Sequence, residues 1–237
     1  MSHIDDLIAE HCPDGVEHKP LGQVGEFIRG NGLQKSDLQE FGIPAIHYGQ
    51  VHTIYGVWTN QTISYVSPTL ASRLRRARHG DIILATTSED DAAVGKATAW
   101  LGNEEVAVSG DAFIFRHILE PRYVAYFLNS ASFQEQKKRY ITGTKVKRLS
   151  SFALERIIIP VPPIEIQHEI TRILDTFTAL EAELAVELEA RRKQYVYYRD
   201  SLLSFAEHSE ATDRQTDRQT DRQTDRQTDN YTPKTTE

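Results

Sequence analysis

Residues 164–205, IEIQHEITRILDTFTALEAELAVELEARRKQYVYYRDSLLSF, decide the architecture of this chain. Apolar residues recur along them at alternating spacings of four and three, the pattern by which a helix presents one seam to a partner helix. No proline or glycine interrupts the stretch. We therefore predict one long helix that contacts a second helix through Ile166, Ile170, Ile173, Phe177, Leu180, Leu184, Leu188, Tyr195, Tyr198 and Leu202.

The seam has one irregularity. Leu188 follows Leu184 by four residues where three would continue the alternation, and Arg191 occupies the next seam position. At 1.5 Å per residue the helix is about 60 Å long, well beyond an ordinary globular helix. An apolar stripe of this length needs a partner, which is either another long helix or the chain's own domain.

Composition divides the chain at residues 160–163, PVPP, and again near Glu207. We predict a globular domain over residues 1–162, the long coiled-coil helix over 163–208 and a tail over 209–237. The prolines at the first boundary stop the preceding element and separate two kinds of apolar pattern.

Short runs of β-branched and aromatic residues predict strands in the globular domain at 62–66, 81–85 and 112–115. The apolar spacing in 121–138 predicts a helix that begins at a proline. The run over 157–160 is short, apolar and ended by proline, so it predicts a buried strand that leads out of the domain. The fold class that follows is α+β.

The tail contains four copies of Thr-Asp-Arg-Gln over residues 212–227. Alternating charges without apolar residues cannot build a core, so we predict a disordered segment. The codons ACA-GAC-AGA-CAG encode Thr-Asp-Arg-Gln, so a tetranucleotide ACAG repeat read in three frames would produce the tract. We hypothesise a slippage-prone DNA repeat that causes phase variation, because gaining or losing one unit shifts the reading frame. The alternative is an ordinary amino-acid linker.

The overall charge argues against a uniformly basic nucleic-acid-binding protein. The 237 residues include 27 Lys and Arg against 34 Asp and Glu, a net charge of −7. No apolar run reaches membrane-spanning length, and the first residues, MSHIDD, lack the features of a signal peptide. The expected location is cytoplasmic, with no membrane partner.

Catalytic motifs are missing. VGKAT at 94–98 lacks the first glycine and the final Ser or Thr of a phosphate-binding loop, and the acidic residues of 13–19 share one turn-prone stretch. The single cysteine, Cys12, rules out a cysteine-based zinc site within one chain. We expect no catalytic residue, no metal site and no cofactor in this chain.

Two local clusters of basic residues stand out against the acidic average. RLRRAR at 73–78 holds four arginines, and 137–148 holds six basic residues and no acidic one. Such clusters suit phosphate contacts, because displaced counterions drive binding, although each can equally be a solvated face. The candidate DNA-binding residues are Lys35, Tyr48, Gln50, Arg73, Arg75, Arg76, Arg78, Thr144, Lys145, Lys147 and Arg148.

The ordered motifs of residues 12–206 resemble the specificity subunits of type I restriction-modification systems. The most specific similarity is the junction between domain and helix, where that family often has a Glu-Gln pair and this chain has Ile166-Gln167. The matching segments are CPDGV at 12–16, PLG at 20–22, GIP at 42–44, GDIIL at 80–84, GTKVKRL at 143–149, IIIPVPPIEIQHEI at 157–170 and ILD at 173–175.

The resemblance implies a non-catalytic adaptor that reads double-stranded DNA. Its globular domain would be a target-recognition domain that binds one half of a split target, and its helix would be a spacer that docks modification subunits. Catalysis would lie on partner chains: a methyltransferase that uses S-adenosylmethionine after base flipping, and a restriction motor that uses ATP and Mg²⁺.

Family members usually carry two recognition domains and two antiparallel helices, whereas this chain has one of each. The resemblance therefore implies a homodimer with antiparallel helices that reads an interrupted palindrome. Two other interpretations remain open. One is a coiled-coil interaction adaptor without DNA specificity, and the other is a nuclease, for which the sequence offers no plausibly spaced carboxylate pair.

Overall fold

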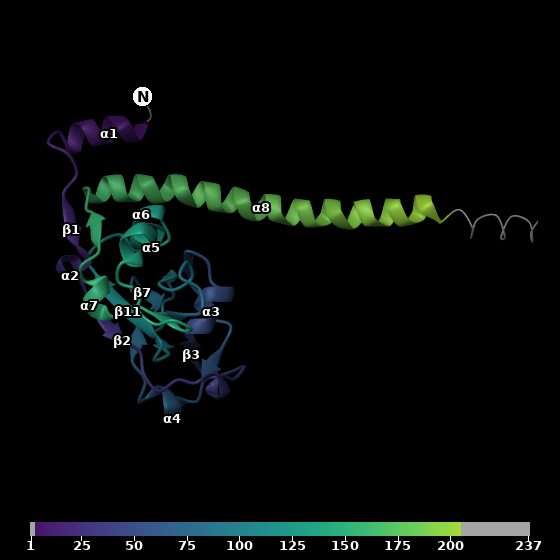
Figure 1. Cartoon of the computed structure of the whole chain (residues 1–237), viewed down its shortest axis with the longest axis horizontal. Coiled ribbons are helices and arrows are strands. Elements are labelled where there is room, and N and C mark those ends of the chain that lie inside the picture. Colours follow the sequence, from purple (N-terminus) through teal and green to yellow (C-terminus); the bar gives the residue numbers. More distant parts are fainter. Residues whose placement is uncertain (1–2, 205–237) are drawn as a thin grey trace, which may run out of the picture. The chain divides into compact units, whose positions relative to one another are not determined.

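The computed structural model describes residues 3–204 (Figure 1). It has the predicted α+β fold with a long C-terminal helix. The helices are α1 (His3–His11), α2 (Leu21–Val24), α3 (Tyr48–Thr53), α4 (Pro68–Ala71), α5 (Pro121–Leu128), α6 (Ala131–Lys138), α7 (Ser151–Leu154), α8 (Ile164–Leu203) and the 3₁₀ turn η1 (Lys35–Asp37). The strands are β1 (His18–Pro20), β2 (Gly25–Arg29), β3 (Ile43–Ile46), β4 (Trp58–Thr59), β5 (Tyr65–Val66), β6 (Arg76–Ala77), β7 (Ile82–Ala85), β8 (Thr87–Ser88), β9 (Ala97–Trp100), β10 (Val106–Val108), β11 (Ala112–His117), β12 (Lys147–Arg148) and β13 (Ile158–Pro160).

The described residues divide into two units, 3–175 and 176–204. The predicted boundary between 162 and 163 lies just before α8, which begins at Ile164, and the first unit runs on to Asp175. The predicted tail over 209–237 and the repeat at 212–227 lie outside the described residues. Among the described residues, no helix is long and apolar enough to cross a membrane.

A five-stranded sheet in the order β2-β11-β7-β9-β4 forms the centre of the first unit. Phe113 and Phe115 of β11 face one core with α5, whereas Ile114 between them faces a second core with α3. The sheet is therefore buried on both faces, which is why β7 and β11 read as continuous apolar runs in the sequence. The strands expected at 81–85 and 112–115 are confirmed, and the one expected at 62–66 is reduced to β5.

A second sheet, in the order β5-β3-β10-β6, is joined to the first through the turn between β10 and β11. The backbone N–H of Gly30, which follows β2, donates to the carbonyl of Ala112 at 2.9 Å. A Cβ on this glycine would lie 2.1 Å from the backbone oxygen of Ser109, so only glycine fits there. This close approach brings the end of β2 against the start of β11.

The helix predicted over 121–138 is wrong in one respect, because it is two helices. Asn129 ends α5, and its side-chain amide donates to the carbonyl of Ala125 at 2.7 Å. Ser130 begins α6, and its hydroxyl accepts from the Phe133 N–H at 3.3 Å. These two polar side chains satisfy the helix ends locally, which lets the chain turn between the helices. Phe127 then packs edge-on against Phe133 with ring centroids 6.2 Å apart.

The first turns of α8 are part of the globular unit. β13 pairs with β1, the prolines after it start α8, and α5 packs beside the helix (Figure 1). Asp175 accepts from the Tyr126 hydroxyl at 2.8 Å and pairs with Arg122 at 2.5 Å. Gln167, 3% exposed, accepts from the Glu120 N–H at 3.0 Å and donates to the Pro162 carbonyl at 2.8 Å. The junction glutamine is therefore a structural residue.

Replacing Gln167 by alanine should lower the free energy of unfolding by about 2–3 kcal/mol, because it leaves one buried donor and one buried acceptor without partners. Gln136 is the matched control, since its amide bridges both backbone groups of Ile158, at 2.9 and 2.8 Å, in an exposed position. Water can replace that bridge, so Gln136→Ala should cost under about 1 kcal/mol. Chemical denaturation of both variants measures the difference, and equal losses would contradict the structural role.

The predicted helix seam divides into two parts. Ile166 is 1% exposed and Ile170 packs against the domain core, so these residues are engaged within the first unit. Beyond Thr176 the seam residues are exposed, with Phe177 at 65% and Leu184 at 64%. The domain therefore covers the start of the helix, and the apolar seam beyond Thr176 is exposed in the single chain.

Candidate nucleic-acid interface

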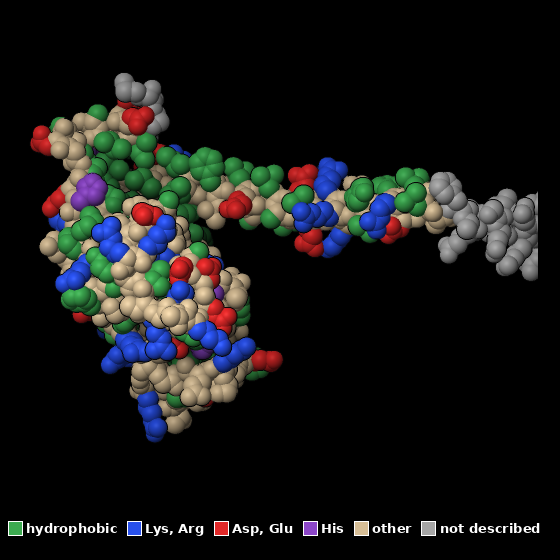
Figure 2. Space-filling model, in the orientation of Figure 1, with side chains coloured by type: hydrophobic (Ala, Val, Ile, Leu, Met, Phe, Trp, Pro, Cys, Tyr) green, Lys and Arg blue, Asp and Glu red, His purple; other side chains and the backbone are tan. Residues whose placement is uncertain are grey.

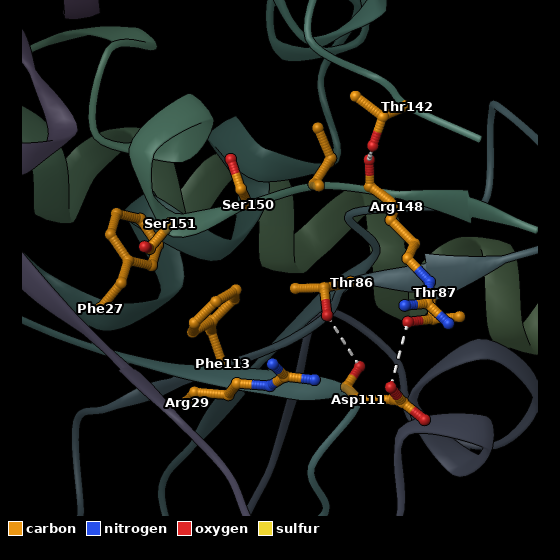
Figure 3. A pocket seen from close by; sticks show the side chains of 11 residues that line it. Phe27, Arg29, Thr86, Thr87, Asp111, Phe113, Thr142, Arg148, Ser150 and Ser151 are labelled. Carbon is orange, nitrogen blue, oxygen red and sulfur yellow. Dashed lines mark hydrogen bonds between the residues drawn. The ribbon is translucent and has the colours of Figure 1, made fainter.

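An open polar cleft of about 510 Å³ lies where β2, β8, β11 and β12 come together (Figure 3). Arg29 and Arg148 contribute guanidinium groups, and Asp111 contributes a carboxylate. Phe27 and Phe113 form one apolar side of the cleft. The remaining lining residues are mostly hydroxyl-bearing: Thr86, Thr87, Thr142, Leu149, Ser150 and Ser151.

Hydrogen bonds to backbone and hydroxyl groups position Arg29 and Asp111 in the cleft. Arg29, the last residue of β2, donates from Nε to the Gly110 carbonyl at 2.9 Å, and its side chain extends toward Asp111 (Figure 3). The Asp111 carbonyl accepts from both the N–H and the hydroxyl of Thr86 at 3.0 Å. The Asp111 carboxylate accepts from the Thr87 hydroxyl at 3.4 Å.

A tight turn carries Arg148, the last residue of the second basic cluster, to the edge of the cleft. β12 pairs with β8, so that Arg148 lies opposite Thr87. Gly143 has a φ of 92°, and a Cβ there would lie 2.1 Å from the Val146 carbonyl oxygen, so the turn requires glycine. Thr144 and Lys145 are exposed at its tip, and Lys147 pairs with Asp91 at 3.2 Å.

Part of the first basic cluster adjoins the same cleft. The Arg75 guanidinium donates to the Arg29 carbonyl at 2.6 Å, and the Asn31 amide bridges the Arg75 N–H at 2.7 Å and the Arg73 carbonyl at 3.0 Å. The exposed Lys35 follows the loop over 30–34, which lines an adjoining hollow together with Arg29 and Asp111. Arg75 also lines the hollow that contains Arg76 and Arg78, so its hydrogen bond to the Arg29 carbonyl links that hollow to the end of β2.

Four candidates serve other contacts. Arg76 and Arg78 both pair with Glu105, at 3.7 and 3.5 Å, and line a separate hollow. The Gln50 amide caps α3 by accepting from the His47 N–H at 2.9 Å and also donates to Ser64 at 2.9 Å. Tyr48 is half-buried and packs against the core under the sheet. Both polar atoms of the Gln50 side chain are therefore engaged in hydrogen bonds within the fold.

Neighbouring residues shift the pKa of His47, the N-cap residue of α3. Burial lowers the pKa of His47 below its ordinary value, Asp111 opposes that shift and Lys35 adds to it. His47 also accepts at Nδ1 from the Gly49 N–H at 3.2 Å. Burial therefore favours the neutral imidazole over the charged form.

A comparison with models of known protein families shows which family the chain belongs to. A family model described as the type I restriction modification DNA specificity domain matches residues 13–190, which include the cleft, the junction and the first part of α8. The chain belongs to this family.

Two curated members of the family are similar over part of the chain. The EcoR124I/EcoR124II specificity subunit of Escherichia coli is 46% identical over 95 residues, 36% of this chain and 22% of the relative. A putative type I specificity subunit of Haemophilus influenzae is 33% identical over 129 residues, 51% of this chain and 31% of the relative. The chain thus spans less than half the length of these relatives.

Solved structures of type I systems share the fold. A chain of a type I R-M system has a TM-score of 0.56 at 23% identity, covering 81% of this chain and 48% of its own length. The HsdS subunit of Thermoanaerobacter tengcongensis has a TM-score of 0.51 at 19% identity, covering 78% of this chain and 44% of its own. These similarities confirm the α+β domain with its long helix.

The sequence analysis missed the central residues of the cleft in this specificity domain. Arg29 and Asp111 stand alone in the sequence, outside either basic cluster, and only strand pairing brings them to Arg148. Figure 2 shows Lys and Arg side chains in a band across the lower part of the globular unit, with acidic side chains beside them at the right. No group of acidic, histidine and cysteine side chains that could hold a metal ion occurs among residues 3–204.

Proposed function

We propose that this chain reads double-stranded DNA sequence for a type I restriction-modification complex, and that methylation, restriction and translocation are carried out by partner subunits. The match of the specificity-domain family to residues 13–190 carries the proposal. The cleft adds physical support, since its guanidinium, carboxylate and hydroxyl groups are the types that contact phosphates and base edges. S-adenosylmethionine, ATP and Mg²⁺ would bind those partner subunits.

The exposed part of the seam supports a homodimer. From Phe177 to Leu202 the seam positions other than Arg191 present large apolar side chains, such as Leu180 at 47% and Tyr195 at 65% exposed. Pairing with an antiparallel copy would cover these side chains and place a recognition domain at each end. A two-fold symmetric pair of identical readers recognises an interrupted palindrome, with the spacer set by the helix length.

Methylation mapping tests the proposal. The chain is expressed with its modification subunit in a methylation-free host, and the genome is sequenced for modified adenines. We expect an interrupted palindrome. An asymmetric split motif would contradict the homodimer, since it requires a second, different reader. The absence of new methylation together with no salt-dependent DNA binding by the purified chain would favour a protein-interaction adaptor instead.

Asp91→Asn should strengthen binding to every DNA sequence by about 3- to 10-fold. Asp91 holds Lys147 at 3.2 Å beside the cleft, so removing its charge frees that ammonium group for a phosphate. The slope of log affinity against log salt should steepen by up to about one. Glu89→Gln is the control, because it removes the same charge from the same loop without breaking that pair. An unchanged slope in Asp91→Asn would contradict the role.

A further inference from the structure

We propose that Asp111 is a base-reading residue that accepts a hydrogen bond from the amino group of a cytosine, in a G·C pair whose guanine is contacted by Arg29 or Arg148. This inference rests on the proposed DNA-reading function and adds the base pair that the cleft selects. It also assigns specificity to Asp111, which lies outside both basic clusters of the sequence.

The position of the carboxylate argues against a cleft that binds only phosphate. Asp111 lines the cleft together with two guanidinium groups, and an additional hollow formed by 30–34 shares both Arg29 and Asp111. A negative charge at this point repels the DNA backbone and weakens binding to every sequence equally. A base edge, in contrast, presents donors as well as acceptors, so a carboxylate there gains a hydrogen bond.

The backbone of Asp111 is held in place, and its carboxylate is not neutralised by an ion pair. Among residues 3–204, no ion pair joins Asp111 to an arginine or lysine, although Arg29 and Arg148 line the same cleft. Its side-chain contact is the long hydrogen bond from the Thr87 hydroxyl, 3.4 Å. The backbone of Asp111 is fixed separately by Thr86. A positioned carboxylate with free acceptor capacity suits recognition of a donor on a ligand.

The arginines supply the complementary half of the pair. Arg29 uses Nε for the Gly110 carbonyl, which fixes the guanidinium plane and leaves its terminal nitrogens as donors. Guanine presents two acceptors, O6 and N7, in the major groove, and its cytosine presents one amino donor beside them. A cleft with guanidinium donors next to a carboxylate acceptor therefore matches G·C. In A·T the adenine amino donor lies where guanine presents O6, and the thymine carbonyl acceptor lies where cytosine presents its amino donor, so both kinds of group would be mismatched.

The test uses the full chain and a randomised DNA duplex library from which bound sequences are selected and sequenced. The wild-type chain should enrich one G·C pair in each half-site that Asp111→Asn no longer selects, with discrimination at that position falling about 10-fold or more. Asp14→Asn is the control, since it removes the same charge from an exposed turn outside the cleft. Its selected motif should equal that of the wild type.

A modified base provides a second test that does not depend on the folding of a variant. N4-methylcytosine still pairs with guanine but fills the major-groove hydrogen position of the amino group. Placing it at the selected pair should weaken wild-type binding about 10-fold or more, and N4-methylation at other positions should have less effect.

The outcomes separate this inference from the proposed function. A wild-type chain that enriches no sequence contradicts the proposed function itself. A wild-type chain that is sequence-specific, while Asp111→Asn binds all sequences more tightly with an unchanged motif, overturns the base-reading role and leaves Asp111 as a repulsive charge. Wild-type binding that is insensitive to N4-methylation at every position overturns it as well.

Discussion

Leu180→Glu combined with Leu184→Glu should convert a dimer into monomers, with the dissociation constant raised about 1,000-fold or more. Both side chains are exposed in the single chain and occupy adjacent seam positions of α8. Burying a leucine stabilises an interface by about 1.5–3 kcal/mol, and two copies of the helix lose four leucines together. At 1.4 kcal/mol per tenfold change, the loss exceeds three orders of magnitude. Sedimentation velocity over a concentration series measures it.

The control for this experiment is Ala179→Glu combined with Ala182→Glu. These alanines lie on the same turns of α8 but outside the seam, so the variant adds the same charge without removing an apolar contact. Its dissociation constant should stay within about tenfold of the wild-type value. Equal dissociation of both variants would show that charge rather than the seam controls association, and a wild-type monomer at micromolar concentration would contradict the dimer.

The second largest effect is expected on DNA affinity, when the positive charges of the cleft are reversed. Arg29→Glu combined with Arg148→Glu should weaken DNA binding by more than about 100-fold, because each change removes a cation from the cleft and introduces a repulsive carboxylate. Each lost contact costs about 1–3 kcal/mol. Binding of a labelled duplex, followed by fluorescence anisotropy at constant salt, measures the loss.

Lys19→Glu combined with Arg192→Glu makes the same change in net charge at residues that do not line the cleft. Long-range charge effects are screened beyond about 10 Å at 0.1 M salt, so this control should bind DNA nearly as well as the wild type. If both double variants lose binding equally, net charge explains the effect and the cleft is not the DNA site. Circular dichroism of each variant verifies that the fold is retained.

The sequence predicted the elements whose signals are local. The apolar spacing of α8 and the absence of proline and glycine predict the long helix, and its bounds, Ile164–Leu203, agree with the prediction to within a few residues. The apolar runs at β7 and β11 identified two central strands. The break between α5 and α6 escaped prediction, since the caps at Asn129 and Ser130 depend on contacts that apolar spacing does not report.

A cluster of basic residues in a sequence does not show which side chains are free to bind DNA and which are engaged in ion pairs or hydrogen bonds within the fold. Arg73, Arg75, Arg76 and Arg78 read as one group, yet β6 directs Arg76 and Arg78 to Glu105 while Arg75 reaches the backbone of β2. Gln50 was chosen for its amide, and that amide caps α3. Side-chain partners from distant strands decide these roles, so composition alone cannot assign them.

By itself, the sequence determined that this chain has an α+β domain followed by a long helix with an apolar seam, because periodicity and proline breaks act over neighbouring residues. Only the tertiary structure decided where the seam becomes available and which charges share a cleft. Ile166 enters the core because β13 pairs with β1, and Arg29, Asp111 and Arg148 meet because β11 pairs with β2 and β12 with β8. Strand pairing joins residues more than a hundred positions apart, and no local pattern encodes that distance.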